Sequence, residues 1–167
     1  MKGHESYRVT VTKDYLVFSS AHFITFAGHR CEGLHGHNYR AHVTVEGRLG
    51  DESWFVFDFV ELKKLMRVLC DEIDHLVLLP TRSDRIAVTV DGERVAVSVD
   101  GRPRYVFPTR DCALLPIPNT TVEMLAKLLA ERLRIAIPAE DAQRLTAIEM
   151  EVEENFGQSA VYRIDLA

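Results

Sequence analysis

Cysteine is scarce in this sequence of 167 residues, which contains only Cys31, Cys70 and Cys112. An odd number of cysteines without a framework spacing argues against structural disulfides, so reduced thiols are expected. Cys70 falls among the apolar positions of a predicted helix and is expected to be packed there. Cys31 lies instead in a segment rich in glycine and histidine, and it is therefore the cysteine to consider for chemistry.

Long apolar runs and an excess of positive charge are also absent. No run approaches the roughly 20 apolar residues that a membrane-spanning helix needs. Residues 1–6 lack the apolar core of a signal peptide, so a cytoplasmic location is expected. The formal net charge is −5 at pH 7, and the overall charge therefore favours neither nucleic acid nor an anionic membrane as a partner.

Periodic apolar residues predict the fold class. Alternation predicts four strands, over residues 7–18, 37–47, 145–154 and 159–166. Apolar residues at helical spacing follow Asp58 and again Thr120, and both starts resemble a capping box. This order predicts an α+β fold with two helices on one face of an antiparallel sheet. The edges or the other face of such a sheet need cover, so an oligomer is expected.

Residues 85–107 interrupt this order. They read as three short Val-rich strands separated by Asp91-Gly92 and Asp100-Gly101, and Asp-Gly between alternating strands is a strong hairpin signal. We expect an inserted β-meander within a single domain that spans residues 1–167. A tolerated surface insertion is the simplest interpretation. The alternatives are that it covers a barrel edge, extends a subunit contact or reshapes the mouth of a pocket.

The segment His35-Gly36-His37 enters the second predicted strand. Residues two apart on a strand point to the same side, so both imidazoles can converge on one ion, and His22 ends the preceding strand. Three neutral imidazoles suit zinc and leave an open coordination position, which is typical of a catalytic site. The alternative is a set of surface or hydrogen-bonded histidines, to which we assign His4, His29 and His42.

Glu154 breaks the pattern of its strand. Ile148, Met150 and Val152 are predicted to face inward, and the period of two places Glu154 on the same face. A carboxylate there can accept two parallel hydrogen bonds from a guanidine-like edge of a heterocycle. The alternative is that the strand ends or bulges and leaves Glu154 in solvent.

Asp74 and His75 follow the first predicted helix, where an acid opposes the helix dipole. Together with the unpaired Cys31 they form a candidate thiol–imidazole–carboxylate set. In such a set the acid orients the imidazole, and the imidazole transfers a proton.

These features belong to a series of motifs that spans nearly the whole chain. The motifs are Phe18-Ser19-Ser20-Ala21-His22, Cys31 to Tyr39, Asp58-Phe59, Asp74-His75, Asn119 to Ala126, and Glu154 eight residues before Tyr162. In this order they closely resemble the 6-pyruvoyl-tetrahydropterin synthase / 6-carboxytetrahydropterin synthase family.

The resemblance implies a tunnelling fold (T-fold), with a four-stranded antiparallel sheet, two helices and subunits that assemble into a barrel, usually as a hexamer of two trimers. It implies a pterin triphosphate substrate, usually 7,8-dihydroneopterin triphosphate. The implied residues are zinc ligands His22, His35 and His37, proton-handling Cys31, Asp74 and His75, a pterin-anchoring Glu154, and Thr121 and Glu123 near the pterin pocket.

Three residues separate Cys31 from His35, and this short spacing resembles the bacterial queuosine-pathway enzyme. That enzyme makes 6-carboxytetrahydropterin with loss of triphosphate and acetaldehyde. The alternatives are the pyruvoyl enzyme, a zinc hydrolase of a pterin or purine-like substrate, and a non-catalytic T-fold protein in which Cys31 closes the zinc site. The apolar run 76–80 and the meander depart from the family pattern. Candidates for binding triphosphate are Arg30, Arg40 and Arg82.

Overall fold

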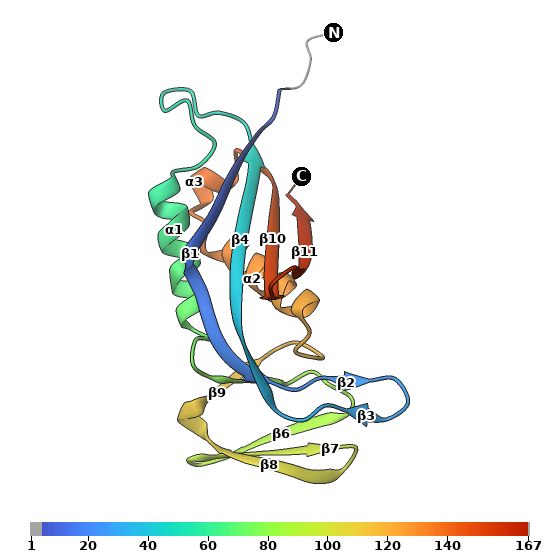
Figure 1. The fold of residues 1–167 in the computed structure, drawn as a ribbon. Coiled ribbons are helices and arrows are strands. Elements are labelled where there is room, and N and C mark those ends of the chain that lie inside the picture. The colour runs from blue at the N-terminus through green and yellow to red at the C-terminus, as the bar shows by residue number, and fades with distance from the viewer. Residues whose placement is uncertain (1–4, 167) are drawn as a thin grey trace.

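The computed structural model describes residues 5–166, and a six-stranded sheet forms its centre (Figure 1). Four long antiparallel strands make up most of the sheet: β11 (Gln158–Asp165), β10 (Leu145–Asn155), β4 (His35–Gly47) and β1 (Tyr7–His22). All four correspond to predicted strands, and the α+β class is confirmed. The first strand continues to His22, four residues beyond the predicted end, and so carries this histidine into the sheet.

Two short strands extend the sheet beyond the four that the sequence predicted. β5 (Val77–Pro80) pairs in parallel with β1, and β9 (Cys112–Leu115) pairs in parallel with β5. The apolar run 76–80 is thus a buried strand, in which Leu78 and Leu79 are fully buried. Its place beside β1 attaches the chain that follows the first helix to the strand that ends in His22.

Both long helices pack on the same face of the sheet (Figure 1). α1 (Phe59–Asp71) contacts β1, and α2 (Val122–Ala136) contacts β10 and β11. A four-residue helix, α3 (Ala139–Ala142), precedes β10. No helix within residues 5–166 is long and apolar enough to cross a membrane.

The two predicted capping boxes have different outcomes. Asp58 is the N-cap of α1, and its carboxylate accepts a hydrogen bond of 2.6 Å from the Val60 amide. The prediction at Thr120 was wrong: the N-cap of α2 is Thr121, and its side chain makes no capping bond. The Thr120 hydroxyl instead donates to the Phe23 carbonyl at 3.0 Å, because Thr120 is buried against the end of β1.

Replacing Asp58 with alanine is expected to lower the free energy of unfolding by about 1 kcal/mol, because the Val60 amide loses its acceptor. Urea unfolding followed by circular dichroism measures this change. Asp51→Ala, at an exposed position in the preceding turn, is the matched control and is expected to leave stability unchanged. Equal stability of both variants would show that the cap contributes nothing.

The region predicted as a meander forms a separate three-stranded antiparallel sheet. Its strands are β6 (Ile86–Asp91), β7 (Arg94–Val99) and β8 (Arg102–Pro108), followed by a 3-10 turn, η1 (Thr109–Asp111). Both predicted Asp-Gly turns are present, with Gly92 and Gly101 in the left-handed region at φ of 55° and 75°. The meander lies beyond the end of the main sheet, next to a short hairpin of β2 (Thr25–Phe26) and β3 (Arg30–Cys31) (Figure 1).

Candidate functional site

Three histidines meet where β1 ends and β4 begins. His22 is the register partner of His35 across the two strands, and His37 follows two residues later on β4. One ring nitrogen of each residue lies within 4.8 Å of those of the other two. The structure therefore brings together the residues that the sequence selected, as a cluster compatible with a metal site.

Hydrogen bonds to backbone carbonyls orient two of these three histidines. The Nδ1 atom of His22 lies 2.8 Å from the Thr120 carbonyl, and Nδ1 of His35 lies 2.9 Å from the Gly33 carbonyl. A carbonyl only accepts, so each Nδ1 carries a proton, and in a neutral ring Nε2 is then the nitrogen with the free lone pair. Burial also lowers the pKa of His22, which favours the neutral imidazole that a metal requires.

The fit of a metal rests on one buried atom. His22 is 1% exposed, and its Nε2 has no hydrogen-bond partner among the described residues. A buried, unpaired acceptor is costly unless a hydrogen-bond donor or a cation binds to it. A cation held by three imidazoles satisfies it, and the backbone carbonyls that fix the ring orientations are typical outer partners of zinc-binding histidines.

Glu154 faces this cluster from β10. Its Oε1 lies 3.4 Å from Nε2 of His22 and 3.8 Å from Nε2 of His37. The strand does bulge between Glu153 and Asn155, as one alternative expected, but Glu154 keeps its inward direction and is 24% exposed. Burial, with the Glu154 charge adding to it, raises the pKa of Tyr39. The carboxylate is therefore next to the histidines, where it can contact either a metal or its ligand.

Asp74 and His75 form the predicted pair. The Asp74 carboxylate accepts from the Ser19 amide at 2.7 Å and lies 2.9 Å from Nδ1 of His75. Burial pushes the pKa of Asp74 upward, but these two hydrogen bonds outweigh it and hold the pKa below its ordinary value. His75 is exposed and lines a cavity of about 590 Å³ together with His37. An oriented imidazole thus opens into the same space as a candidate metal ligand.

Cys31 occupies a different hollow, of about 600 Å³, whose lining includes Arg102 and Arg104 of the meander. Burial raises the pKa of its thiol, and the positive charges of Arg104 and Arg85 oppose this rise. The predicted set of Cys31, Asp74 and His75 implies an imidazole beside the thiol, but no histidine within residues 5–166 is among the groups whose charges shift the Cys31 pKa. In the described chain the charges that favour the thiolate are two guanidinium groups, and the hollow is not the one that His75 lines.

The predicted substrate residues are spread more widely. Thr121 and Glu123 lie at the start of α2, and Glu123 is exposed. Neither lines the two cavities that contain His37. Of the three candidate triphosphate residues, only Arg40 shares a cavity with His37 and Glu154; its volume is about 460 Å³. Arg30 stacks on the Phe26 ring at 5.4 Å, and the backbone amide of Arg82 bonds to Ile117.

Glu32 is a neighbour of the cluster that sequence reasoning missed. Its Oε2 lies 3.8 Å from Nε2 of His35. The sequence feature that could have identified Glu32 is its position: an acidic residue directly after Cys31, in the segment that leads to the histidines. The site therefore has two carboxylates near its imidazoles: Glu154 near His22 and His37, and Glu32 near His35.

Comparisons with known proteins agree on one family. A family model described as 6-pyruvoyl tetrahydropterin synthase matches residues 10–165. A Methanocaldococcus jannaschii protein, provisionally named 6-carboxy-5,6,7,8-tetrahydropterin synthase, is 34% identical over 148 residues, or 89% of this chain and 90% of that protein. Two solved 6-pyruvoyl tetrahydropterin synthases cover 97% of this chain and 99% of their own. That of Plasmodium falciparum has a TM-score of 0.89 at 29% identity. That of Plasmodium vivax, a variant of a catalytic glutamate, has a TM-score of 0.88 at 27% identity.

Proposed function

Because the chain belongs to the 6-pyruvoyl tetrahydropterin synthase family and has its tunnelling fold, we propose that it is a zinc-dependent lyase acting on 7,8-dihydroneopterin triphosphate. The proposed products are 6-carboxy-5,6,7,8-tetrahydropterin, triphosphate and acetaldehyde, as a step of queuosine biosynthesis in the cytoplasm. One observation carries the proposal: three imidazoles converge around the unpaired, buried Nε2 of His22. The name of the M. jannaschii relative and the spacing of Cys31 and His35 support the carboxy product.

His22, His35 and His37 would hold the zinc ion. Bound zinc would polarise the hydroxyl groups of the substrate side chain and make the neighbouring C–H protons more acidic. Cys31, as the thiolate, would remove such a proton, and the nearby guanidinium groups favour this charged form. His75, oriented by Asp74, would return a proton at another carbon from the cavity that it shares with His37.

Glu154 would bind the pterin ring. Its two carboxylate oxygens match adjacent N–H donors of a guanidine-like edge, and its charge acts on the neighbouring Tyr39. A ring fixed at this point places the substrate side chain over the histidines, because Glu154 lies within 3.8 Å of two of them. Such fixation keeps each reacting proton within reach of its base.

Glu32 is a second candidate acid–base group. Its carboxylate lies close to His35, on the side of the cluster that leads to Cys31. The P. vivax neighbour was solved with a catalytic glutamate replaced, so a glutamate acts in catalysis in at least that relative. Proton removal stays assigned to Cys31 on the spacing of Cys31 and His35, and Glu32 is the residue to test beside it.

We further propose that the chain assembles into a homohexamer of two trimers. In the described chain β11 and β9 form the two edges of the main sheet. Unpaired edges of this kind invite pairing with a second copy. A pterin site built between subunits would also explain why Thr121 and Glu123 lie apart from the histidine cavities of one chain.

Incubation of the zinc-loaded protein with 7,8-dihydroneopterin triphosphate, followed by mass analysis of the pterin, tests the proposed reaction. We expect the 6-carboxy product and one acetaldehyde for each turnover, and none after the metal is removed with a chelator. A 6-pyruvoyl product would assign the chain to the other branch, which the two Plasmodium structures represent. Hydrolysis of the ring, or no reaction, would favour a zinc hydrolase or a non-catalytic assembly.

A further inference from the structure

The meander makes direct contact with the backbone that carries Cys31. We call residues 26–34 the Cys31 segment. The Arg104 guanidinium donates to the Glu32 carbonyl at 2.6 Å, and the Leu34 amide donates to the Tyr105 hydroxyl at 3.1 Å. Two adjacent residues of β8 thus bond the chain directly after Cys31, where it continues toward His35.

A second connection lies on the other side of Cys31. The Arg85 guanidinium donates to the Phe26 carbonyl at 2.6 Å and to the Arg30 carbonyl at 3.3 Å. Asp100 holds this guanidinium by two bonds, at 2.9 and 2.7 Å. An arginine with two hydrogen bonds to one carboxylate has few remaining orientations. Arg85 is therefore fixed, and its bonds to the Phe26 and Arg30 carbonyls hold both strands of the β2–β3 hairpin in place.

Apolar packing joins the same two parts of the chain. Cys31 packs against an apolar cluster built mainly from the meander, which includes Val95 and Val97. The Tyr105 ring contacts the buried Phe23 ring at a centroid distance of 5.3 Å. The Cys31 side chain therefore packs against the meander. The backbone before and after Cys31 is hydrogen-bonded to the meander as well.

The Cys31 segment has little structure of its own. β2 and β3 are two residues each, and an isolated hairpin of any length is marginal in water. The connecting turn has Gly28 and His29 at φ of 72° and 58°, so part of the turn is in a region that non-glycine residues rarely adopt. Such a segment takes its conformation from its surroundings, and in this chain those surroundings are the meander.

We propose that the meander is part of the active site: Arg104 and Tyr105 are positioning residues that fix the Cys31 segment, so that the thiol is presented to the substrate in one orientation. This assignment rests on the proposed function, in which Cys31 removes a proton. Arg104 acts on the backbone of Glu32, and its positive charge also favours the Cys31 thiolate. The meander is thus more than a tolerated surface insertion.

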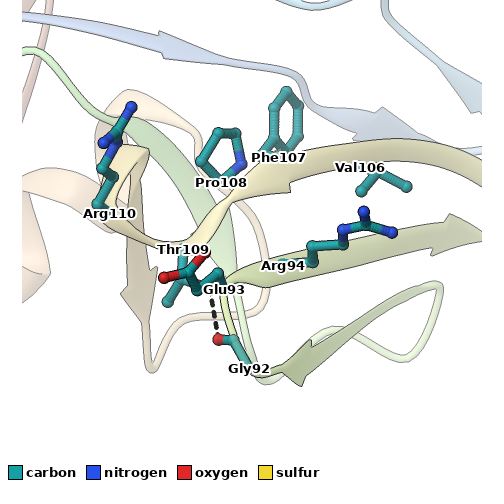
Figure 2. A pocket seen from close by; sticks show the side chains of 8 residues that line it. All are labelled: Gly92, Glu93, Arg94, Val106, Phe107, Pro108, Thr109 and Arg110. Atoms are coloured by element: carbon teal, nitrogen blue, oxygen red, sulfur yellow. Dashed lines mark hydrogen bonds between the residues drawn. The ribbon is translucent and has the colours of Figure 1, made fainter.

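Two variants each remove one of the two hydrogen bonds between β8 and the Cys31 segment. Tyr105→Phe keeps the ring but removes the hydroxyl that the Leu34 amide bonds, and Arg104→Gln removes the charge and the long donor. Arg94→Gln is the matched control, because Arg94 lies on the same small sheet but lines a hollow of about 720 Å³ at its far turn, with Glu93 and Arg110 (Figure 2). Arg104→Lys keeps the charge and a donor and tests for rescue.

Amide hydrogen exchange of the Cys31 segment is the first measurement. We expect faster exchange of residues 26–34 in Tyr105→Phe and Arg104→Gln, with the Leu34 amide the most affected in Tyr105→Phe. The rate at which iodoacetamide modifies Cys31, resolved by peptide mass analysis over a range of pH, is expected to shift to higher pH in Arg104→Gln and to recover in Arg104→Lys. Neither quantity is expected to change in Arg94→Gln.

Kinetics complete the test. We expect kcat to fall about tenfold in Tyr105→Phe and Arg104→Gln with little change in KM, since a small displacement of a reacting group is costly, and zinc content to stay constant. Exchange and kcat equal to wild type in both variants would overturn the proposal, as would equal losses in Arg94→Gln. If no variant, including wild type, shows synthase activity, the proposed function fails; faster exchange in the two variants would still support positioning by the meander.

Discussion

Replacing Cys31 with alanine is expected to lower kcat by about two to four orders of magnitude, the usual contribution of a general base. If the three histidines bind zinc as proposed, the variant is expected to bind zinc as the wild type does, because these histidines lie on β1 and β4 and are not bonded to the thiol. Turnover of dihydroneopterin triphosphate, measured together with metal content, separates loss of the base from loss of the site. Cys31 is half-buried, so its removal leaves the main core intact.

Cys112→Ala is the control for this experiment. Cys112 is also half-buried with a pKa raised by burial, but it lies on β9 and its thiol bonds the Pro108 carbonyl. Its replacement is expected to leave turnover unchanged. Near wild-type turnover in Cys31→Ala would contradict the proposed role of the thiol. In that event a loss of activity in Glu32→Gln would transfer the role to the carboxylate near His35.

Replacing His37 with alanine is expected to abolish stoichiometric zinc binding, and turnover with it. Two imidazoles then remain of the three whose nitrogens converge, and zinc in proteins requires about three or four ligands. Zinc at one hundred times its Kd would stabilise the wild-type fold by about 2.7 kcal/mol, and the variant would lose this increment. Elemental analysis of the purified protein and thermal unfolding with and without zinc measure both effects.

His42→Ala provides the comparison. His42 lies on the same strand, β4, but an odd number of residues from His37, so it points to the opposite face and lies 3.4 Å from Glu151. Zinc content and the zinc-dependent rise in stability are expected to remain as in wild type. Zinc binding by His37→Ala at the wild-type level would refute the three-histidine site.

The cluster itself was predictable because strands have a short, local period. Alternation placed His35 and His37 on one side of β4, and the same period carried the inward face of β10 as far as Glu154. The structure places Glu154 within 3.4 Å of His22, although a bulge follows Glu153. Where each residue's direction is fixed by its own strand, the sequence is sufficient.

The short parallel strands were not predictable on this basis. Val77–Pro80 is a continuous apolar run without alternation, which periodicity alone assigns to no particular element. Its pairing with Cys112–Leu115 joins segments separated by the whole meander. Long-range pairing of this kind depends on burial in the finished fold, and no local sequence pattern predicts such pairing.

The start of α2 and the surroundings of Cys31 were missed for a related reason. Thr120 fits a capping box, but its hydroxyl and carbonyl are used by Phe23 and His22 from the end of β1. Likewise, Arg104 contacts the backbone of Glu32 across 72 positions of sequence. Bonds from side chains to distant backbone leave no periodic signal, so they become visible only in three dimensions.

The far turn of the meander, at Gly92, is a place where this chain can be lengthened. Gly92 has a positive φ and open space around it, and its carbonyl accepts from Thr109 at 3.0 Å (Figure 2). Exposed turns of this kind accept inserted residues, and each doubling of a flexible loop costs only about 0.6 kcal/mol. A peptide tag or fluorescent label inserted there would allow the protein to be detected, while the opposite end of the meander keeps its contacts with the Cys31 segment.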